Sequence, residues 1–324
     1  MRAVGTSAMG LSDSRQDAYS PRMAGRGWGG SIATAVGVAA GAGAAQLGIG
    51  YGLGVIAWPP STGGAGESAW VASLAWATWI AATSAVAGAI CADRLSPGAQ
   101  STLDQTRSAL QTALWRTALA LASAIGALVT VPLVAVPARA VDHATSSSPQ
   151  TIAGGYAIVG VVVGLVAAVG ALASRAIAVN VVANVSWLWL LAIVAVIDGV
   201  AAGRGLASAQ LAVWQFTSSG PEFRSIHIWQ ALLTLGAALL IGALAALPAA
   251  RRGDGPVGVA ISGAVGPLLV AAAYLLAAPR LDGIPPRELS AYLIVPYAVI
   301  AGLAGSVVVA ALAPRFEPRA VTAA

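Results

Sequence analysis

Lysine is absent from this chain of 324 residues, and all 17 of its basic residues are arginine. Without a lysine amine there can be no Schiff base to retinal or to pyridoxal phosphate. The phosphate-binding motif GxxxxGK[ST] is excluded for the same reason, so the chain has no Walker A site of its own. Partnership with a separate ATPase subunit stays open, and we expect no cofactor.

Cysteine and histidine are nearly absent as well. Cys91 is the only cysteine, which excludes an internal disulfide and a thiolate metal cluster. The two histidines, His143 and His227, fall between apolar stretches, so haem held between membrane-spanning histidines is disfavoured. The motifs HExxH and GxSxG do not occur. The sequence therefore predicts no metal site and no catalytic residue.

Charge is scarce for a protein of this size. Only 9% of the residues are charged and 58% are hydrophobic, whereas about a quarter of a soluble domain is charged. The net charge of +5 alone would suit a nucleic-acid partner. The arginines, however, are scattered along the chain without interleaved aromatic residues, which does not indicate nucleic-acid binding. They are typical of topology signals and of contacts to anionic lipid headgroups in a membrane protein.

What the sequence does have is eight long apolar stretches. A helix needs about 20 apolar residues to cross the hydrocarbon core of a bilayer, and these stretches lack the alternation of barrel strands. The prediction is an all-α, polytopic transmembrane bundle in contact with the lipid bilayer. Its eight helices are expected at Ser31–Trp58, Trp70–Cys91, Ala113–Val136, Ile152–Ala173, Ile177–Ala202, Ile228–Leu247, Val257–Ala278 and Ala291–Ala313.

The distribution of arginine predicts the orientation. If the N-terminus is cytoplasmic, the inner segments hold twelve arginines and the outer loops hold five, as the positive-inside rule requires. Residues 1–30 are polar, rich in Gly and Ser and too acidic for a signal peptide, and we expect a disordered cytoplasmic tail there. Residues 314–324 are expected to form a second cytoplasmic tail. The composition is typical of bacteria, which favours the cytoplasmic (inner) membrane.

The two halves of the chain share several landmarks. Trp70 precedes Arg94 by 24 residues, and Trp229 precedes Arg252 by 23. Near the end of each half, Tyr-Ala-Ile or Tyr-Ala-Val leads to Ala-Leu-Ala-Ser-Arg or Ala-Leu-Ala-Pro-Arg. These landmarks predict a duplication into four-helix repeats at residues 31–176 and 177–313. Because four crossings restore the starting side, the repeats would be parallel, related by an axis along the membrane normal.

Two polar residues inside the apolar stretches are candidate ligand contacts. Asp198 is the one acid placed within a span away from a cytoplasmic end, and such residues usually face the protein interior or a water cavity. In the repeat alignment Asp198 falls close to Gln46. The pair predicts a polar site between the repeats. The alternative is that Asp198 lies one turn from the outer interface and pairs with Arg204 there.

The longest outer loop is a weaker candidate. It runs from Gly203 to His227, and its Leu206, Leu211 and Trp214 are spaced for an interfacial amphipathic helix. Glu222, Arg224 and His227 in this loop are possible ligand contacts, although charged loop residues are usually just solvated.

Small residues indicate how the helices pack. Gly37 with Gly41 and Gly48 with Gly52 form GxxxG pairs in the first helix, and Gly160 with Gly164 forms one in the fourth. Such pairs allow close helix contact within the membrane. They indicate either packing inside the chain or a homo-oligomer interface.

Three functions fit these observations. The leading hypothesis is a permease or transporter-like component with Asp198 and Gln46 near its site and an unknown substrate. The alternative is a non-catalytic scaffold or accessory subunit that binds a partner membrane protein. An enzyme acting on lipid-linked substrates would need Asp142, Glu222 and Asp282 to converge, and their spacing gives no reason to expect it.

Overall fold

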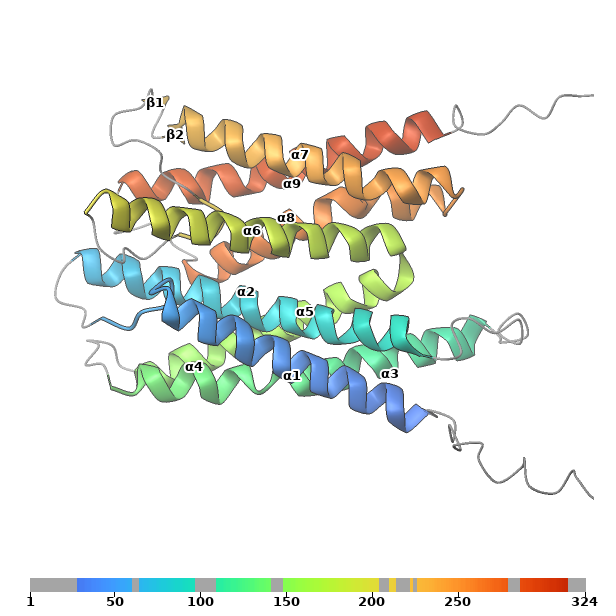
Figure 1. Cartoon of the computed structure of the whole chain (residues 1–324), viewed down its shortest axis with the longest axis horizontal. Helices are drawn as coiled ribbons and strands as arrows, with labels where there is room; N and C mark the ends of the chain where they lie inside the picture. Colours follow the sequence, from blue (N-terminus) through green and yellow to red (C-terminus); the bar gives the residue numbers. More distant parts are fainter. Residues whose placement is uncertain are drawn as a thin grey trace, which may run out of the picture.

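The computed structural model describes residues 28–59, 64–96, 109–140, 148–203, 210–213, 222–223, 226–278 and 286–313. Within these residues the chain forms a helical bundle with one small two-stranded hairpin (Figure 1). The elements are α1 (Trp28–Gly52), α2 (Gly64–Leu95), α3 (Ala109–Ala127), α4 (Thr130–Ala138), α5 (Pro149–Ala173), α6 (Arg175–Ala201), β1 (Glu222–Phe223), β2 (Ile226–His227), α7 (Ile228–Arg251), α8 (Pro256–Ala277) and α9 (Pro286–Leu312).

Eight spans in this part of the chain are long and apolar enough to cross a membrane, with α3 and α4 together forming one of them. The predicted all-α fold and the number of spans are therefore confirmed, and the protein is an integral membrane protein in contact with lipid. The two tails expected at residues 1–30 and 314–324 lie outside the described residues, apart from residues 28–30 at the start of α1.

The distribution of side chains fits a bundle surrounded by lipid. Large aliphatic residues point outward, such as Val166 (70% exposed) on α5 and Leu244 (65%) on α7. The interior holds many small residues, among them Ala75 and Ser84, both fully buried. Because lipid tails are as apolar as leucine, helices gain by close contact between small residues rather than by hiding leucine.

The first helix ends earlier than predicted, at Gly52 rather than Trp58. Gly54 adopts a positive φ of 70°, a conformation that only glycine reaches without strain. The chain then turns back, and the N–H groups of Val55 and Ile56 both donate to the carbonyl oxygen of Gly50. Val55 and Ile56 are buried against the bundle instead of extending the span.

The third span is broken into α3 and α4, close to Pro132. Proline has no N–H to donate to the carbonyl four residues back, and its ring crowds that carbonyl. Leu128 and Val129 accordingly form a turn, in which the N–H of Val131 donates to Leu128 three residues back. A proline inside a span is expected to bend or break the helix, and α3 and α4 are separated where Pro132 would cause this.

The two halves pack their helices in the same pairs. In the first half α5 packs against α2 and against α3 and α4, and in the second half α9 packs against α7 and α8. Gly164 of α5 lies against the backbone of Ala82, and Gly305 of α9 lies against the backbone of Leu239. These contacts agree with the sequence offsets between the halves. They support the duplication, which stays a prediction.

The halves differ in their second helices. The most apolar window of α2 is 83% buried, because α2 also contacts α6 and α8 of the other half. The corresponding window of α7 is only 22% buried. The two halves therefore differ in how deeply their second helices are buried: α2 is enclosed and α7 is open to the surroundings.

Charge is concentrated at one end of the bundle. The start of α1 and the end of α9 lie at this end, which we call the Trp28 end; the opposite one is the Gly52 end (Figure 1). Of the six arginines whose side chains the structure describes, only Arg139 lies at the Gly52 end. The others, at the Trp28 end, are Arg94, Arg116, Arg175, Arg251 and Arg252. The asymmetry has the sense that the positive-inside rule needs.

Candidate functional site

Gln46 lies where the two halves meet. Its Oε1 accepts hydrogen bonds from Trp189 Nε1 (3.0 Å) on α6 and from Thr83 Oγ1 (3.3 Å) on α2. Its Nε2 donates to Ser84 Oγ at 3.2 Å. One side chain thus ties α1 to α2 and to the first helix of the second half.

Three indole rings pack next to Gln46. Trp76 and Trp79 of α2 are buried, and their ring centroids lie 5.4 and 6.3 Å from that of Trp189. Aromatic rings at such distances attract one another beyond the effect of burial alone. This junction is filled by side chains, and its polar groups bond to one another.

Asp198 lies elsewhere on α6. It is nine residues from Trp189, which is about 13.5 Å along the helix and about half a turn around it. It is partly exposed and lies one turn before the end of α6 at the Gly52 end. Asp198 is thus separated along α6 from Trp189, the residue of this helix that bonds to Gln46, and the polar site predicted for Asp198 and Gln46 stays a prediction.

The outer-loop candidates are only partly described. Glu222 belongs to β1 and pairs with His227 in β2, but its side chain and all of Arg224 lie outside the described residues. The backbone N–H of His227 donates to Ser290 Oγ, which donates in turn to Gln230 Oε1. Ser290 and Gln230 are buried. The His227 backbone thus joins α7 to α9.

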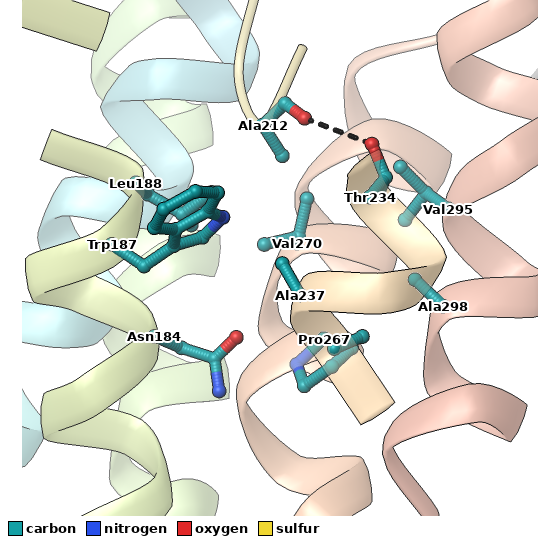
Figure 2. A pocket seen from close by; sticks show the side chains of 11 residues that line it. Asn184, Trp187, Leu188, Ala212, Thr234, Ala237, Pro267, Val270, Val295 and Ala298 are labelled. Atoms are coloured by element: carbon teal, nitrogen blue, oxygen red, sulfur yellow. Dashed lines mark hydrogen bonds between the residues drawn. The ribbon is translucent and has the colours of Figure 1, made fainter. Parts of the chain in front are cut away.

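A pocket lies within the second half, between α6, α7, α8 and α9. The cavity itself has a volume of about 30 Å³, room for one or two water molecules, and its empty space reaches about 360 Å³ only when the open mouth is included. The lining is mostly apolar, with Asn184 and Thr234 as the polar residues (Figure 2). None of the lining residues is titratable, so this part of the described chain offers a neutral site. A mostly apolar cavity with few polar groups is typical of small-molecule sites.

A segment of the loop between α6 and α7 covers one side of the pocket. Leu211, Ala212 and Val213 are buried, and the hydroxyl of Tyr274 on α8 donates to the carbonyl oxygen of Leu211. Thr234 Oγ1 donates to the Ala212 oxygen at 3.5 Å (Figure 2). The loop here enters the bundle instead of lying on it, so the expected interfacial helix does not include residues 210–213.

Ala212 also has a positive φ of 63°, which is costly for a residue with a side chain. The contacts of Leu211 with Tyr274 and of Ala212 with Thr234 hold this segment in place. A strained residue on a pocket wall is a frequent property of binding sites.

Asn180 and Asn184 form a polar pair on α6 beside the pocket. Asn180 is fully buried, and its Oδ1 accepts the backbone N–H of Gly266 on α8 at 3.0 Å. Asn184 Nδ2 donates to the same Oδ1 (3.2 Å) and to the Asn180 carbonyl (3.0 Å). Because a backbone N–H can only donate, this network fixes which end of each amide is oxygen. It leaves Asn184 Oδ1 turned toward the pocket (Figure 2).

The helix opposite this pair, α8, is continuous from Pro256 to Ala277 and contains Pro267 in its middle. Gly266, just before the proline, donates its N–H to Asn180 Oδ1, and Gly263 donates to Ser306 Oγ of α9 at 3.1 Å. Side chains of α6 and α9 therefore support the α8 backbone where the proline removes a hydrogen bond.

Comparison with known families, curated proteins and solved structures finds no match to this chain. The site must therefore be interpreted from its own residues.

Sequence reasoning found Gln46 but missed Asn180, Asn184 and Thr234. The sequence did contain a signal for the two asparagines, because they are four residues apart, share one face of a helix and lie in an otherwise apolar span. It was missed because only ionisable residues were considered. The role of Leu211 and Ala212 on the pocket wall was also missed. The spacing of Leu211 suggested an interfacial helix, and only the tertiary structure brings this segment to α7 and α8.

The glycines of α1 behave differently from those of α5. Gly160 and Gly164 pack against the backbone of α2, as expected for close helix crossing. A side chain at Gly37, Gly41, Gly48 or Gly52 would meet nothing within 4 Å. The α1 pairs do not serve packing within the described chain.

Proposed function

We propose that this protein is a permease-like transporter whose substrate site is the pocket between α6, α7, α8 and α9. The observation that carries the proposal is a neutral cavity between four helices of a membrane-spanning bundle, beside α8 with its internal Pro267. Sites between the helices of a bundle are common for small ligands, and a proline lets a helix bend there. Gln46 takes the role of joining the halves, and Asp198 lies outside this site.

The pocket favours an uncharged substrate. Transfer of an ion into an apolar cavity is costly unless a counter-charge compensates it, and no lining residue carries one. Following the arginines, we place the Trp28 end of the bundle in the cytoplasm and the protein in the bacterial cytoplasmic membrane. An energy source such as a separate ATPase subunit stays a prediction.

The proposal is testable without knowing the substrate. Cys91 is the only cysteine, so Cys91→Ser gives a background for single cysteines at Thr234, Ala237 and Asn184. We expect a membrane-impermeant thiol reagent, applied from either side of oriented proteoliposomes, to label the Asn184→Cys variant from both sides. Ala85→Cys, at a buried position, is the matched unlabelled control. Transport is contradicted if the pocket cysteines are as unreactive as this control.

A specific observation favours the scaffold as a second candidate. The α1 face formed by Ala33, Gly37, Gly41, Gly48 and Gly52 is open, and small-residue faces allow helices of other chains to approach closely. A second copy or a partner membrane protein would pack there. Gly41→Ile should then abolish cross-linking between α1 helices in native membranes, whereas Val166→Ile on α5 should not. Equal cross-linking in both variants would remove this candidate.

A further inference from the structure

Asn180 of α6 carries an unsatisfied donor inside the second half of the bundle. Its side chain is fully buried, and its Nδ2 has no hydrogen-bond partner among the described residues. Its Oδ1 accepts from the backbone N–H of Gly266 and from Asn184 Nδ2, which fixes the orientation of the amide. A buried N–H without an acceptor is costly, so this position calls for a bound molecule that accepts a hydrogen bond.

Asn184, one turn further along the same face of α6, offers the opposite group. Its Nδ2 donates to Asn180, and its Oδ1 is turned toward the pocket (Figure 2). Residues four apart are separated by about 6 Å along a helix. An acceptor at the pocket is therefore followed by a donor one turn nearer to the Trp28 end, where α6 begins.

The two asparagines lie deep in the membrane. Asn184 is nine residues from the start of α6, which places it about 13.5 Å along the helix, close to the middle of a hydrocarbon core about 30 Å thick. Amides at this depth are expensive unless they have partners. A solute that passes between the pocket and the Trp28 end can use both of them in turn.

The size of the cavity limits what can bind there. Its volume of about 30 Å³ holds one or two water molecules. Trp187 and Leu188 of α6 and Ala237 of α7 are among the residues that form its walls. A ring or a sugar is therefore too large, and a molecule of about two or three non-hydrogen atoms, with the bulk of two waters, is the largest that fits.

We infer that the substrate is a neutral molecule of about this size that both donates and accepts hydrogen bonds, donating to Asn184 Oδ1 and then accepting from Asn180 Nδ2. The inference rests on the transport function proposed above and narrows its substrate class. An ion of the same size is excluded, because no charged side chain lines the described cavity and the transfer of a charge into it is costly.

The test measures the entry of formamide into proteoliposomes that hold the full-length protein, by stopped-flow light scattering. Formamide is neutral, fits the size limit and carries both a donor and an acceptor. We expect it to enter several-fold faster than into protein-free liposomes. Glycerol, which is larger, and formate, which is charged, should enter at the protein-free rates.

Two results would overturn the inference. One is formamide entry at the protein-free rate. The other is an increase in water permeability alone, because Asn180 and the cavity would then hold water only.

Two variants locate the path. Ala237→Leu fills the cavity and should reduce formamide entry to the protein-free rate. Leu232→Phe enlarges a side chain of the same helix that is 58% exposed, and formamide entry should persist. If Ala237→Leu fails to fold, Ala237→Val fills the same space with a smaller group. Full entry in a folded, filled variant contradicts the site.

A third variant tests the polar contact. Asn184→Leu has nearly the same shape, removes the acceptor and leaves the bond between Asn180 and Gly266 in place. Formamide entry should slow about threefold or more, as for one lost hydrogen bond. Unchanged entry in the folded variant would contradict the assigned contact.

This inference and the proposed function can fail separately. Two-sided labelling of Asn184→Cys without formamide entry would remove this substrate class and leave transport of another solute. Formamide entry without that labelling would keep the substrate class and replace a transporter that opens to both sides by a narrow channel.

Discussion

At the scale of single residues, polar groups within the spans do two different jobs. Gln46 is satisfied by Trp189, Thr83 and Ser84 and holds helices together. Asn184 donates from its nitrogen to Asn180, whose own Nδ2 has no partner among the described residues, and turns its oxygen to a cavity. The sequence predicted Gln46 as a ligand contact because it aligns with Asp198 in the repeat, whereas in the structure its amide bonds to three side chains. Which amide keeps a free acceptor depends on tertiary contacts and could not be predicted.

Gln46→Leu should destabilise the protein without touching the pocket. The substitution leaves Trp189 Nε1 without its acceptor, and hydrogen bonds between membrane helices contribute about 0.6 kcal/mol on average and up to about 1.7. We expect thermal unfolding in detergent to occur a few degrees lower, with thiol labelling of a single cysteine at Ala237 unchanged at temperatures where the variant is folded. Ser186→Ala is the control, since Ser186 bonds only to its own helix. An unchanged melting temperature would contradict the role of Gln46.

Asp198→Asn distinguishes the site predicted from the sequence, at Asp198 and Gln46, from the pocket found in the structure. Asp198 does not line the pocket, so the amide should leave thiol labelling of a single cysteine at Ala237 unchanged. The labelling rate in proteoliposomes measures this. A clear change in that rate would connect Asp198 to the pocket and favour the polar site first predicted from the sequence.

At the scale of helices, the apolar stretches predicted every span, while their ends and contacts depended on single residues. The α1 end moved to Gly52 because Gly54 can reverse the chain, and the third span broke near Pro132 because its ring interrupts the ladder. The GxxxG pattern alone did not distinguish glycines that pack from glycines that face outward. That distinction needs the position of neighbouring helices.

A matched pair of glycine substitutions measures the difference. Gly164→Ala places a methyl group against the carbonyl of Ala82, and such overpacking costs about 1–3 kcal/mol. Gly41→Ala meets no atom within 4 Å and raises helix propensity. We expect the first variant to unfold at lower temperature and the second to be equal to the parent protein or more stable. Equal destabilisation by both would show that Gly41 packs against something.

At the scale of the whole molecule, composition predicted the membrane, the number of spans and an uneven distribution of arginine. The asymmetry between the halves was not predictable. The landmarks shared by the repeats suggest equivalent roles for α2 and α7, yet α2 is enclosed by both halves and α7 is open to lipid. Burial of this kind is set by how the halves dock, and no local pattern encodes it.

Sided labelling tests the orientation of the bundle. Single cysteines replacing Arg252 at the Trp28 end and Arg139 at the Gly52 end lie on opposite faces. In intact cells we expect an impermeant reagent to label Arg139→Cys and to spare Arg252→Cys until the membrane is opened. The reverse pattern would invert the topology, and labelling of both from one side would contradict the number of crossings.

The central position of α2 has a consequence for biosynthesis. Three helices that pack against it, α5, α6 and α8, are synthesised later, so α2 enters the membrane before they are present. The hydroxyls of Ser73, Thr78, Thr83 and Ser84 each donate to a carbonyl of α2 itself. These four hydroxyls therefore have hydrogen-bond acceptors within α2 before α5, α6 and α8 have been synthesised. Ribosome-stalled chains ending after α4 should therefore already hold α2 across the bilayer, exposing to lipid the tryptophans that the finished protein conceals.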